Sequence, residues 1–227
     1  VPTNEAMAEY FSADPNAEGH DIYESFGGSW DNVPDQIAAD ILKNHQMSSF
    51  VNSTPSHFGT LKDMAGYDME IAEDNIVGSY VARNGIVYLI NKVLPPLDYR
   101  SVMGPVKVDQ GLKIFNLAMG DNYCQFQYYL RSLKSTFNFF VTPDEYMKDY
   151  LDPISAGYSG ARLNSIYEFR LNTNTNTIEA VVRNAATGDS IGINTSGGIS
   201  GALTSRLTDI LNQQTLVGEV IPGQEWY

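Results

Sequence analysis

The sequence predicts an α+β protein, and three observations support this class. Several segments carry apolar residues at helical spacing, other short segments have the alternation and turn residues of strands, and one segment recurs about 140 residues later. Hydrophobic residues make up 43% of the 227 residues, which is enough to bury a core. The length fits two modest domains.

The chain begins with segments that favour helices. Val1–Met7 has the pattern of a strand end that passes into a helix, and Thr3 or Asn4 can cap that helix. Residues 12–34 are rich in Asp, Gly, Pro and Ser, which predicts a loop. Residues 35–43 return to helical spacing, so we expect a second helix there.

Beyond residue 47 the pattern changes to short strands. We expect strands at Met69–Ile71, Ser79–Ala82 and Ile86–Val93. Asn84-Gly85 lies between two of them and predicts a hairpin, since both residues tolerate a positive φ. Pro95-Pro96 ends the last strand because proline supplies no ladder donor, and it marks a domain boundary.

The second half of the chain repeats part of this order. Residues 97–113 have the character of a connection, residues 114–133 carry helical spacing, and Phe139–Val141 predicts a short strand. Val141–Met147 then matches Val1–Met7, with Val, Glu and Met at identical places. A period of this length is that of a domain, so the sequence predicts tandem domains.

An additional β-hairpin is predicted near residues 165–183. Ser165–Leu171 alternates apolar and polar residues, Thr177–Arg183 does so in part, and a run of Asn and Thr separates them. The first copy has no counterpart of this hairpin. We therefore interpret it as an insertion and expect it on the surface, where insertions cost little.

Three segments in order resemble the signatures of the fasciclin domain family. Val-Pro-Thr-Asn-Glu-Ala at 1–6 resembles the first signature, Leu-Lys-Asn-His at 42–45 the central element, and 84–95 the closing hairpin. The resemblance implies tandem fasciclin-like domains, each a wedge of short β-sheets with a helical cluster. Residues 1–97 would be a first domain that lacks its N-terminal part, and 98–227 a second that lacks its C-terminal part.

The same resemblance implies a function at the cell surface. The family acts mostly in cell adhesion and matrix attachment, so we expect a non-catalytic module that binds a protein or matrix, and no cofactor. We expect an extracellular or cell-envelope location, as in a bacterial surface lipoprotein anchored through a missing N-terminus. The alternative is an envelope protein that binds glycans through the aromatic-rich second domain and its hairpin.

Four residues are candidates for binding. His45 matches the family's central His, which mostly organises the core through hydrogen bonds. Asn44 stands where the family has a Tyr that is implicated in partner binding, and Gln214 replaces the His in the second copy. For the glycan alternative, Tyr158 and Tyr167 are the candidate aromatic residues, because exposed rings can stack on sugars.

Charge and composition exclude other classes of partner. The net charge of −13 disfavours nucleic acid and anionic membranes, and no apolar run has the length of a transmembrane helix. The three His residues lack the spacing of a helical zinc site, and Cys124 is interpreted as a small buried residue. Around Asp14 the residues mimic the start of a calcium loop without its final Glu. A plain acidic loop is expected there, and calcium stays open.

Overall fold

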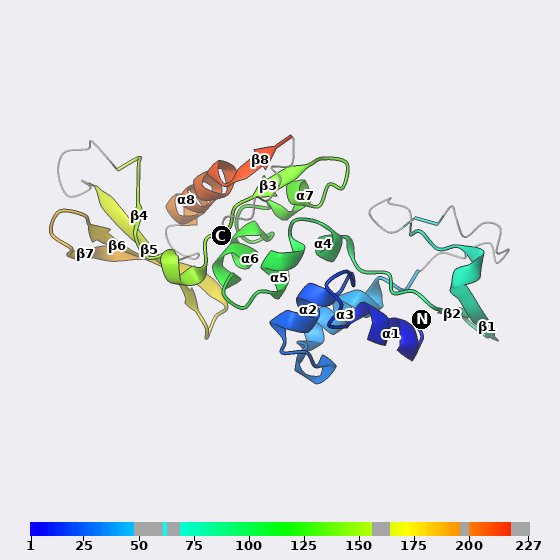
Figure 1. The fold of residues 1–227 in the computed structure, drawn as a ribbon. Helices are drawn as coiled ribbons and strands as arrows, with labels where there is room; N and C mark the ends of the chain where they lie inside the picture. The colour runs from blue at the N-terminus through cyan, green and yellow to red at the C-terminus, as the bar shows by residue number, and fades with distance from the viewer. Residues whose placement is uncertain (48–60, 63–68, 156–163, 196–199, 219–227) are drawn as a thin grey trace. The chain divides into compact units, whose positions relative to one another are not determined.

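The computed structural model describes residues 1–47, 61–62, 69–155, 164–195 and 200–218 (Figure 1). It is a mixed α+β structure with small antiparallel sheets, as the sequence predicts. The chain divides into two compact units, Val1–Arg100 and Ser101–Tyr227. We describe each unit by itself.

Unit 1 begins with three short helices, followed by a hairpin and one further short helix. Helix α1 (Asn4–Tyr10) is followed by α2 (His20–Ser25) and α3 (Asp35–Lys43), with a 3-10 turn η1 (Trp30–Asn32) between the last two. A second such turn, η3 (Glu73–Asn75), leads into β1 (Ile76–Ala82) and β2 (Gly85–Ile90), and α4 (Leu97–Arg100) closes the unit.

The helix predicted at 35–43 is confirmed with the same bounds. The predicted cap is confirmed too, since the Thr3 side chain accepts a hydrogen bond of 3.1 Å from the Ala6 N–H. The loop predicted at 12–34 is wrong, because it contains α2 and η1. Helix α2 has only six residues and one buried side chain, Ile22, so it leaves no periodic pattern to detect.

Gly19 explains why α2 can pack against α1. A Cβ atom at this position would lie 2.4 Å from Cε1 of Tyr10, and the Gly19 N–H donates to the Tyr10 carbonyl at 3.2 Å. Any larger residue would push α2 off the Tyr10 ring. Gly19, which contributed to the loop-like composition of this segment, therefore allows the close contact between α1 and α2.

The predicted hairpin is confirmed as β1 and β2. The two strands pair from Ala82 opposite Gly85, next to the turn, to Ile76 opposite Ile90 at the far end. Its turn differs from the prediction, because the loop consists of Arg83 and Asn84 and neither has a positive φ. No strand forms at 69–71, since that segment makes no ladder. The first residues of the chain lie beside β2, with a parallel bridge between Pro2 and Ile90.

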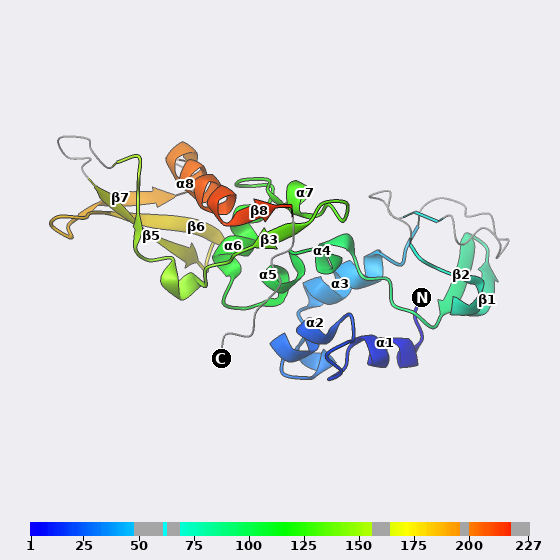
Figure 2. The same ribbon diagram turned by 45° about the horizontal axis from the view of Figure 1, so that its top comes forward.

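Unit 2 holds helices and two further sheets. Helices α5 (Gly104–Val108), α6 (Lys113–Met119) and α7 (Gln127–Leu130) precede β3 (Phe137–Phe139), η4 (Asp144–Tyr146) and β4 (Tyr150–Leu151). Strands β5 (Ser165–Asn172), β6 (Thr177–Asn184) and β7 (Ser190–Thr195) follow, and then α8 (Ser200–Gln213) and β8 (Thr215–Val217). Strand β8 returns to pair with β3, and β4 to β7 form one antiparallel sheet in chain order (Figures 1 and 2).

Two predictions for the helices of unit 2 are wrong. The connection expected at 97–113 contains α4 and α5, and the helix expected over 114–133 divides into α6 and α7. The break occurs at Gly120, and Gln125 takes a positive φ of 54° in the intervening loop. The helical spacing continues across the break because Tyr123 and Phe126 pack on the same core as α6.

The hairpin predicted at 165–183 is confirmed as β5 and β6, but its expected surface location is wrong. Phe169 is 1% exposed, and Ile178 and Ala180 are fully buried. These inward residues join side chains of α6 and α8 in the core of the unit. The outer face carries the ion pairs Arg170–Glu179 at 3.2 Å and Arg183–Glu168 at 2.6 Å. The hairpin is thus a central part of unit 2.

Candidate functional site

The end of α3 places His45 between two backbone segments of unit 1. The Nδ1 atom lies 2.8 Å from the Ile41 carbonyl oxygen, one turn earlier, and Nε2 lies 2.9 Å from the Leu94 nitrogen. Since the Leu94 N–H is a donor, Nε2 must accept and Nδ1 must carry the proton. Both ring nitrogens are therefore occupied by backbone groups.

Asn44 holds the same segment from the other side. Its side-chain amide donates to the carbonyl oxygens of Leu94 at 3.0 Å and Pro95 at 3.2 Å. We call Asn44 and His45 together the α3 clamp. It fixes the chain where it leaves β2, because these bonds satisfy the donor and acceptor of Leu94 beyond the end of the ladder.

Burial lowers the pKa of His45 below the ordinary value of 6.5. The hydrogen bond to Ile41 opposes this shift, and the positive charge of the Val1 amine adds to it. The ring is thus held neutral near pH 7, as the bond from Leu94 requires.

Val1–Thr3 reaches the same region from the start of the chain. The Val1 amine donates to the Tyr88 carbonyl at 2.7 Å, the Ile90 N–H to the Val1 carbonyl at 2.9 Å, and the Thr3 N–H to the Ile90 carbonyl at 2.9 Å. Val1–Thr3 and the α3 clamp therefore both bond to the stretch from Tyr88 to Pro95. All three segments that resemble fasciclin signatures meet here.

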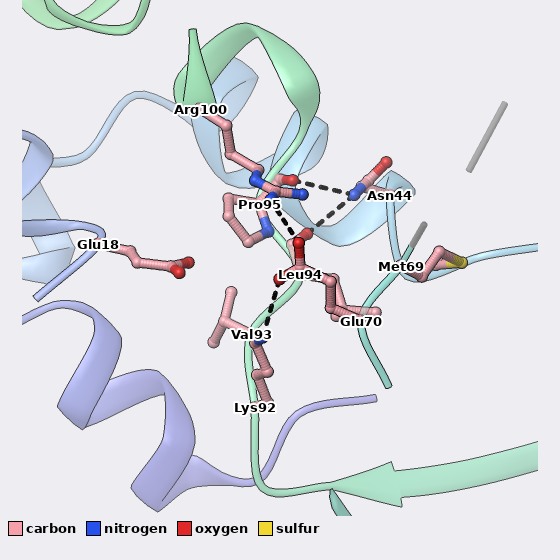
Figure 3. A pocket seen from close by; sticks show the side chains of 9 residues that line it. All are labelled: Glu18, Asn44, Met69, Glu70, Lys92, Val93, Leu94, Pro95 and Arg100. Atoms are coloured by element: carbon pink, nitrogen blue, oxygen red, sulfur yellow. Dashed lines mark hydrogen bonds and ion pairs between the residues drawn. The ribbon is translucent and has the colours of Figure 1, made fainter. Parts of the chain in front are cut away.

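A shallow hollow adjoins the clamp. Figure 3 shows the nine residues that line it: Glu18, Asn44, Met69, Glu70, Lys92, Val93, Leu94, Pro95 and Arg100. The Glu70 carboxylate lies 3.1 Å from Arg100 and 3.7 Å from Lys92. Glu70 also has a positive φ of 51°, a conformation that costs a non-glycine residue free energy. Glu18 extends toward the hollow from the opposite side.

This lining can bind charged groups and is made of charged, amide and apolar side chains. Among its nine residues there is no Ser, Thr, Cys or His. Two carboxylates and two cations give a locally balanced, partly exposed set of charges that another protein surface could contact. No sequence pattern pointed to Glu70 or Arg100, because their pairing joins positions 30 residues apart.

The counterpart of the clamp in unit 2 makes different bonds. The Gln214 side chain donates to the Thr142 hydroxyl at 2.9 Å, and the Phe140 N–H donates to the Gln214 carbonyl at 2.8 Å. Gln214 therefore bonds to the segment that repeats Val1–Met7. The two units use the equivalent position for different contacts.

The structure describes one of the two aromatic candidates, Tyr167. Tyr158 lies outside the described residues. Tyr167 is 6% exposed on β5, and its ring packs against Phe169 at 5.9 Å and Tyr150 at 6.5 Å between centroids. A ligand has no access to the faces of this ring in the structure.

The acidic loop at Asp14 is folded on itself. Its carboxylate accepts hydrogen bonds of 2.9 Å from both the backbone and the side chain of Asn16. In the part of the chain that the structure describes, no three or more His, Cys, Asp or Glu side chains converge as metal ligands would. Cys124 donates a weak hydrogen bond to the Thr204 carbonyl, and burial raises the pKa of its thiol.

Comparisons with known proteins return no match of any kind. No family model, no curated protein and no solved structure matches the chain. Within the described ranges, no helix combines the length and apolar character needed to cross a bilayer. The resemblance to fasciclin domains therefore depends on the residues of this chain alone.

Proposed function

We propose that the chain is a non-catalytic adhesion module of the cell surface, built from tandem fasciclin-like domains, that binds a protein or matrix partner. Units 1 and 2 would correspond to the domains expected at 1–97 and 98–227. One observation supports this most: the first and the central signature-like segments of unit 1 are both bonded to the third, along Tyr88–Pro95.

The hollow beside the α3 clamp is the part of unit 1 that we propose for binding. Asn44 and His45 would act by positioning its wall, since their nitrogens bond to the backbone. Contact with the partner would fall to the charged rim of Glu18, Lys92 and Arg100. Rim charges of this kind give specificity and association rate more than affinity.

Bead attachment tests this proposal. Beads coated with the full chain are placed under flow on surfaces of collagen, fibronectin or albumin, and retained beads are counted. We expect more retention on at least one matrix protein than on albumin. The variant with Glu18→Gln, Lys92→Gln and Arg100→Gln should lose most of this difference, because it removes the charged rim.

A charge-matched control separates the site from general electrostatics. Glu5, Lys43 and Arg83 are exposed and lie outside the hollow, so changing all three to Gln alters the net charge equally. This control should retain beads as the wild type does. Retention on every matrix protein no higher than on albumin would contradict the adhesion proposal, and equal loss in both variants would contradict the role of the hollow.

The glycan alternative gains no support from the residues first considered for it. Tyr167 is buried, and the hairpin of β5 and β6 supplies core residues. Removing residues 165–183 would therefore unfold unit 2 and could not test sugar binding. The extracellular or envelope location stays part of the proposal, and fractionation of the producing cells tests it.

A further inference from the structure

An exposed cluster of polar and aromatic side chains surrounds α7 in unit 2. It consists of Asp121, Gln127, Tyr128 and Arg131, and we call it the α7 platform. The Tyr128 side chain is 61% exposed, which is far more than the buried rings of the core. The proposed adhesion function assigns no role to these residues, and they are not the ones first considered for the glycan alternative.

Hydrogen bonds fix the platform in one arrangement. The Gln127 amide donates to the Asp121 carboxylate at 2.6 Å, and the Tyr128 hydroxyl also bonds to Asp121. This bond to Asp121 raises the pKa of Tyr128, so its hydroxyl stays protonated and acts as the donor. Three neighbouring side chains on the surface are thus linked by hydrogen bonds.

Arg131 supports the Tyr128 ring from one side. Its guanidinium carbon lies 5.6 Å from the ring centroid, which is within the range of a cation–π contact. The high exposure of the residue leaves the rest of the ring to solvent. The neighbouring Tyr129 is 48% exposed and fixed by an edge contact of 5.1 Å to Phe137, so a second aromatic surface lies next to the platform.

This arrangement fits the chemistry of a sugar. A pyranose presents a face of C–H groups that packs on an aromatic ring, and hydroxyls at its edge that bond to planar polar side chains. A ring with only two rotatable bonds loses little entropy on binding, and prior fixation lowers the cost further. The net charge of −13 disfavours sulfated or uronic polymers.

We propose that the α7 platform binds a neutral saccharide, with a pyranose ring stacked on Tyr128 and its hydroxyls bonded to Asp121 and Gln127. The inference goes beyond the adhesion function proposed above and uses no residue of unit 1. A failure of either proposal therefore leaves the other standing.

Saturation-transfer NMR on the full chain tests the proposal. Maltotetraose, cellotetraose and chitotetraose serve as neutral probes, and a heparin tetrasaccharide as an anionic contrast. We expect transfer to at least one neutral probe and none to heparin. Tyr128→Ala should weaken binding at least tenfold, whereas Tyr128→Phe keeps the ring, loses the bond to Asp121 and should weaken it a few-fold.

Tyr146 provides the matched control. It is 69% exposed in the same unit, but among the described residues its side chain has no comparable network of bonds. Tyr146→Ala should bind the probe as the wild type does. Absence of transfer to all three neutral probes, transfer to heparin alone, or unchanged transfer with a Tyr128→Ala variant of native circular dichroism would each overturn the proposal.

Discussion

His45 shows how one side chain can couple stability to pH. Its folded pKa is lowered by burial, so the unfolded chain takes up a proton more readily than the native chain does. The stabilisation is complete above the unfolded value of about 6.5 and is lost as the pH falls through the folded pKa. Protonation also removes the acceptor for the Leu94 N–H.

We therefore predict that the melting temperature of the wild type falls between pH 7 and pH 5 partly through His45. His45→Gln should melt lower at pH 7 because it loses the bridge, and should show a smaller fall over this range. His20→Gln is the control, since the contacts of the His20 ring among the described residues are with the Ser12 carbonyl and Glu24, and neither of these bonds to His45. An identical fall in wild type and His45→Gln would refute this role.

The hydroxyl groups of Tyr10 and Tyr123 differ in their hydrogen bonding. Tyr10 is 6% exposed, and its hydroxyl has no hydrogen-bond partner in the described part of the chain. Burial raises its pKa, with smaller contributions from Glu18 and Asp21. The Tyr123 hydroxyl instead accepts a bond of 2.7 Å from the Ile178 N–H.

Removing the Tyr10 hydroxyl and removing the Tyr123 hydroxyl should affect the free energy of unfolding differently. Tyr10→Phe deletes a buried polar atom without a partner, so the free energy of unfolding should stay unchanged or rise by about 1 kcal/mol. Tyr123→Phe leaves a backbone donor unsatisfied and should lower it by about 1–3 kcal/mol. Urea denaturation measures both. A clear loss of stability in Tyr10→Phe would mean that its hydroxyl is bonded after all.

At the scale of elements, a buried ion pair joins α8 to the segment after β4. Arg206 bonds to Asp152 through Nη2 at 2.9 Å, and its Nε lies 2.7 Å from the other carboxylate oxygen at a bent angle. Asp152 is 2% exposed and also accepts from the Ile154 N–H. The pair holds the end of the sheet to the helix that covers it.

Breaking this pair should cost more than breaking one on the outer face of the sheet. Arg206→Ala leaves a buried carboxylate without its partner and should lower the free energy of unfolding by about 3–5 kcal/mol. Arg183→Ala removes an exposed partner of Glu168, and about 1 kcal/mol or less is expected. Chemical denaturation of the two variants compares them directly, and similar losses would disprove the distinction.

Asp144 lies in the segment that repeats Val1–Met7, and its side chain contacts a helix that comes earlier in the chain. Its carboxylate accepts from the backbone N–H groups of Lys113 and Ile114 at 3.1 and 3.0 Å, so it caps α6. Because Val141–Met147 repeats the pattern of Val1–Met7, a helix start is expected there. Instead only the short turn η4 forms there, and the cap serves a helix 30 residues earlier.

At the scale of the whole molecule, the chain consists of two compact units with their own buried side chains. Opening of one unit need not open the other, because cooperative units of structure can unfold separately. The Arg206→Ala variant allows this to be tested without cutting the chain.

Hydrogen exchange with mass-spectrometric detection should resolve the two units. In Arg206→Ala, peptides from β5, β6 and α8 should exchange faster, while peptides covering α3 and β2 should keep the protection of the wild type. Faster exchange across both sets of peptides by the same factor would mean that the units unfold as one.

The sequence by itself determined the features that depend on neighbouring residues. Helix α3, the Thr3 cap and the β1–β2 and β5–β6 hairpins were all predicted, since periodicity, capping and turns act over a few positions. For the candidate site, the sequence predicted a role for Asn44 and His45. It did not predict their bonds to Leu94 or the charged side chains beside them.

Only the tertiary structure decided which side chains lie inside. Alternation predicted β5 and β6 but not their place in the core, because the same pattern suits a strand whose inner face meets helices and one at the surface. The division of 114–133 and the pairings of Glu70 with Arg100 and Asp152 with Arg206 depend on segments brought together by packing. Such contacts leave no periodic trace in the chain.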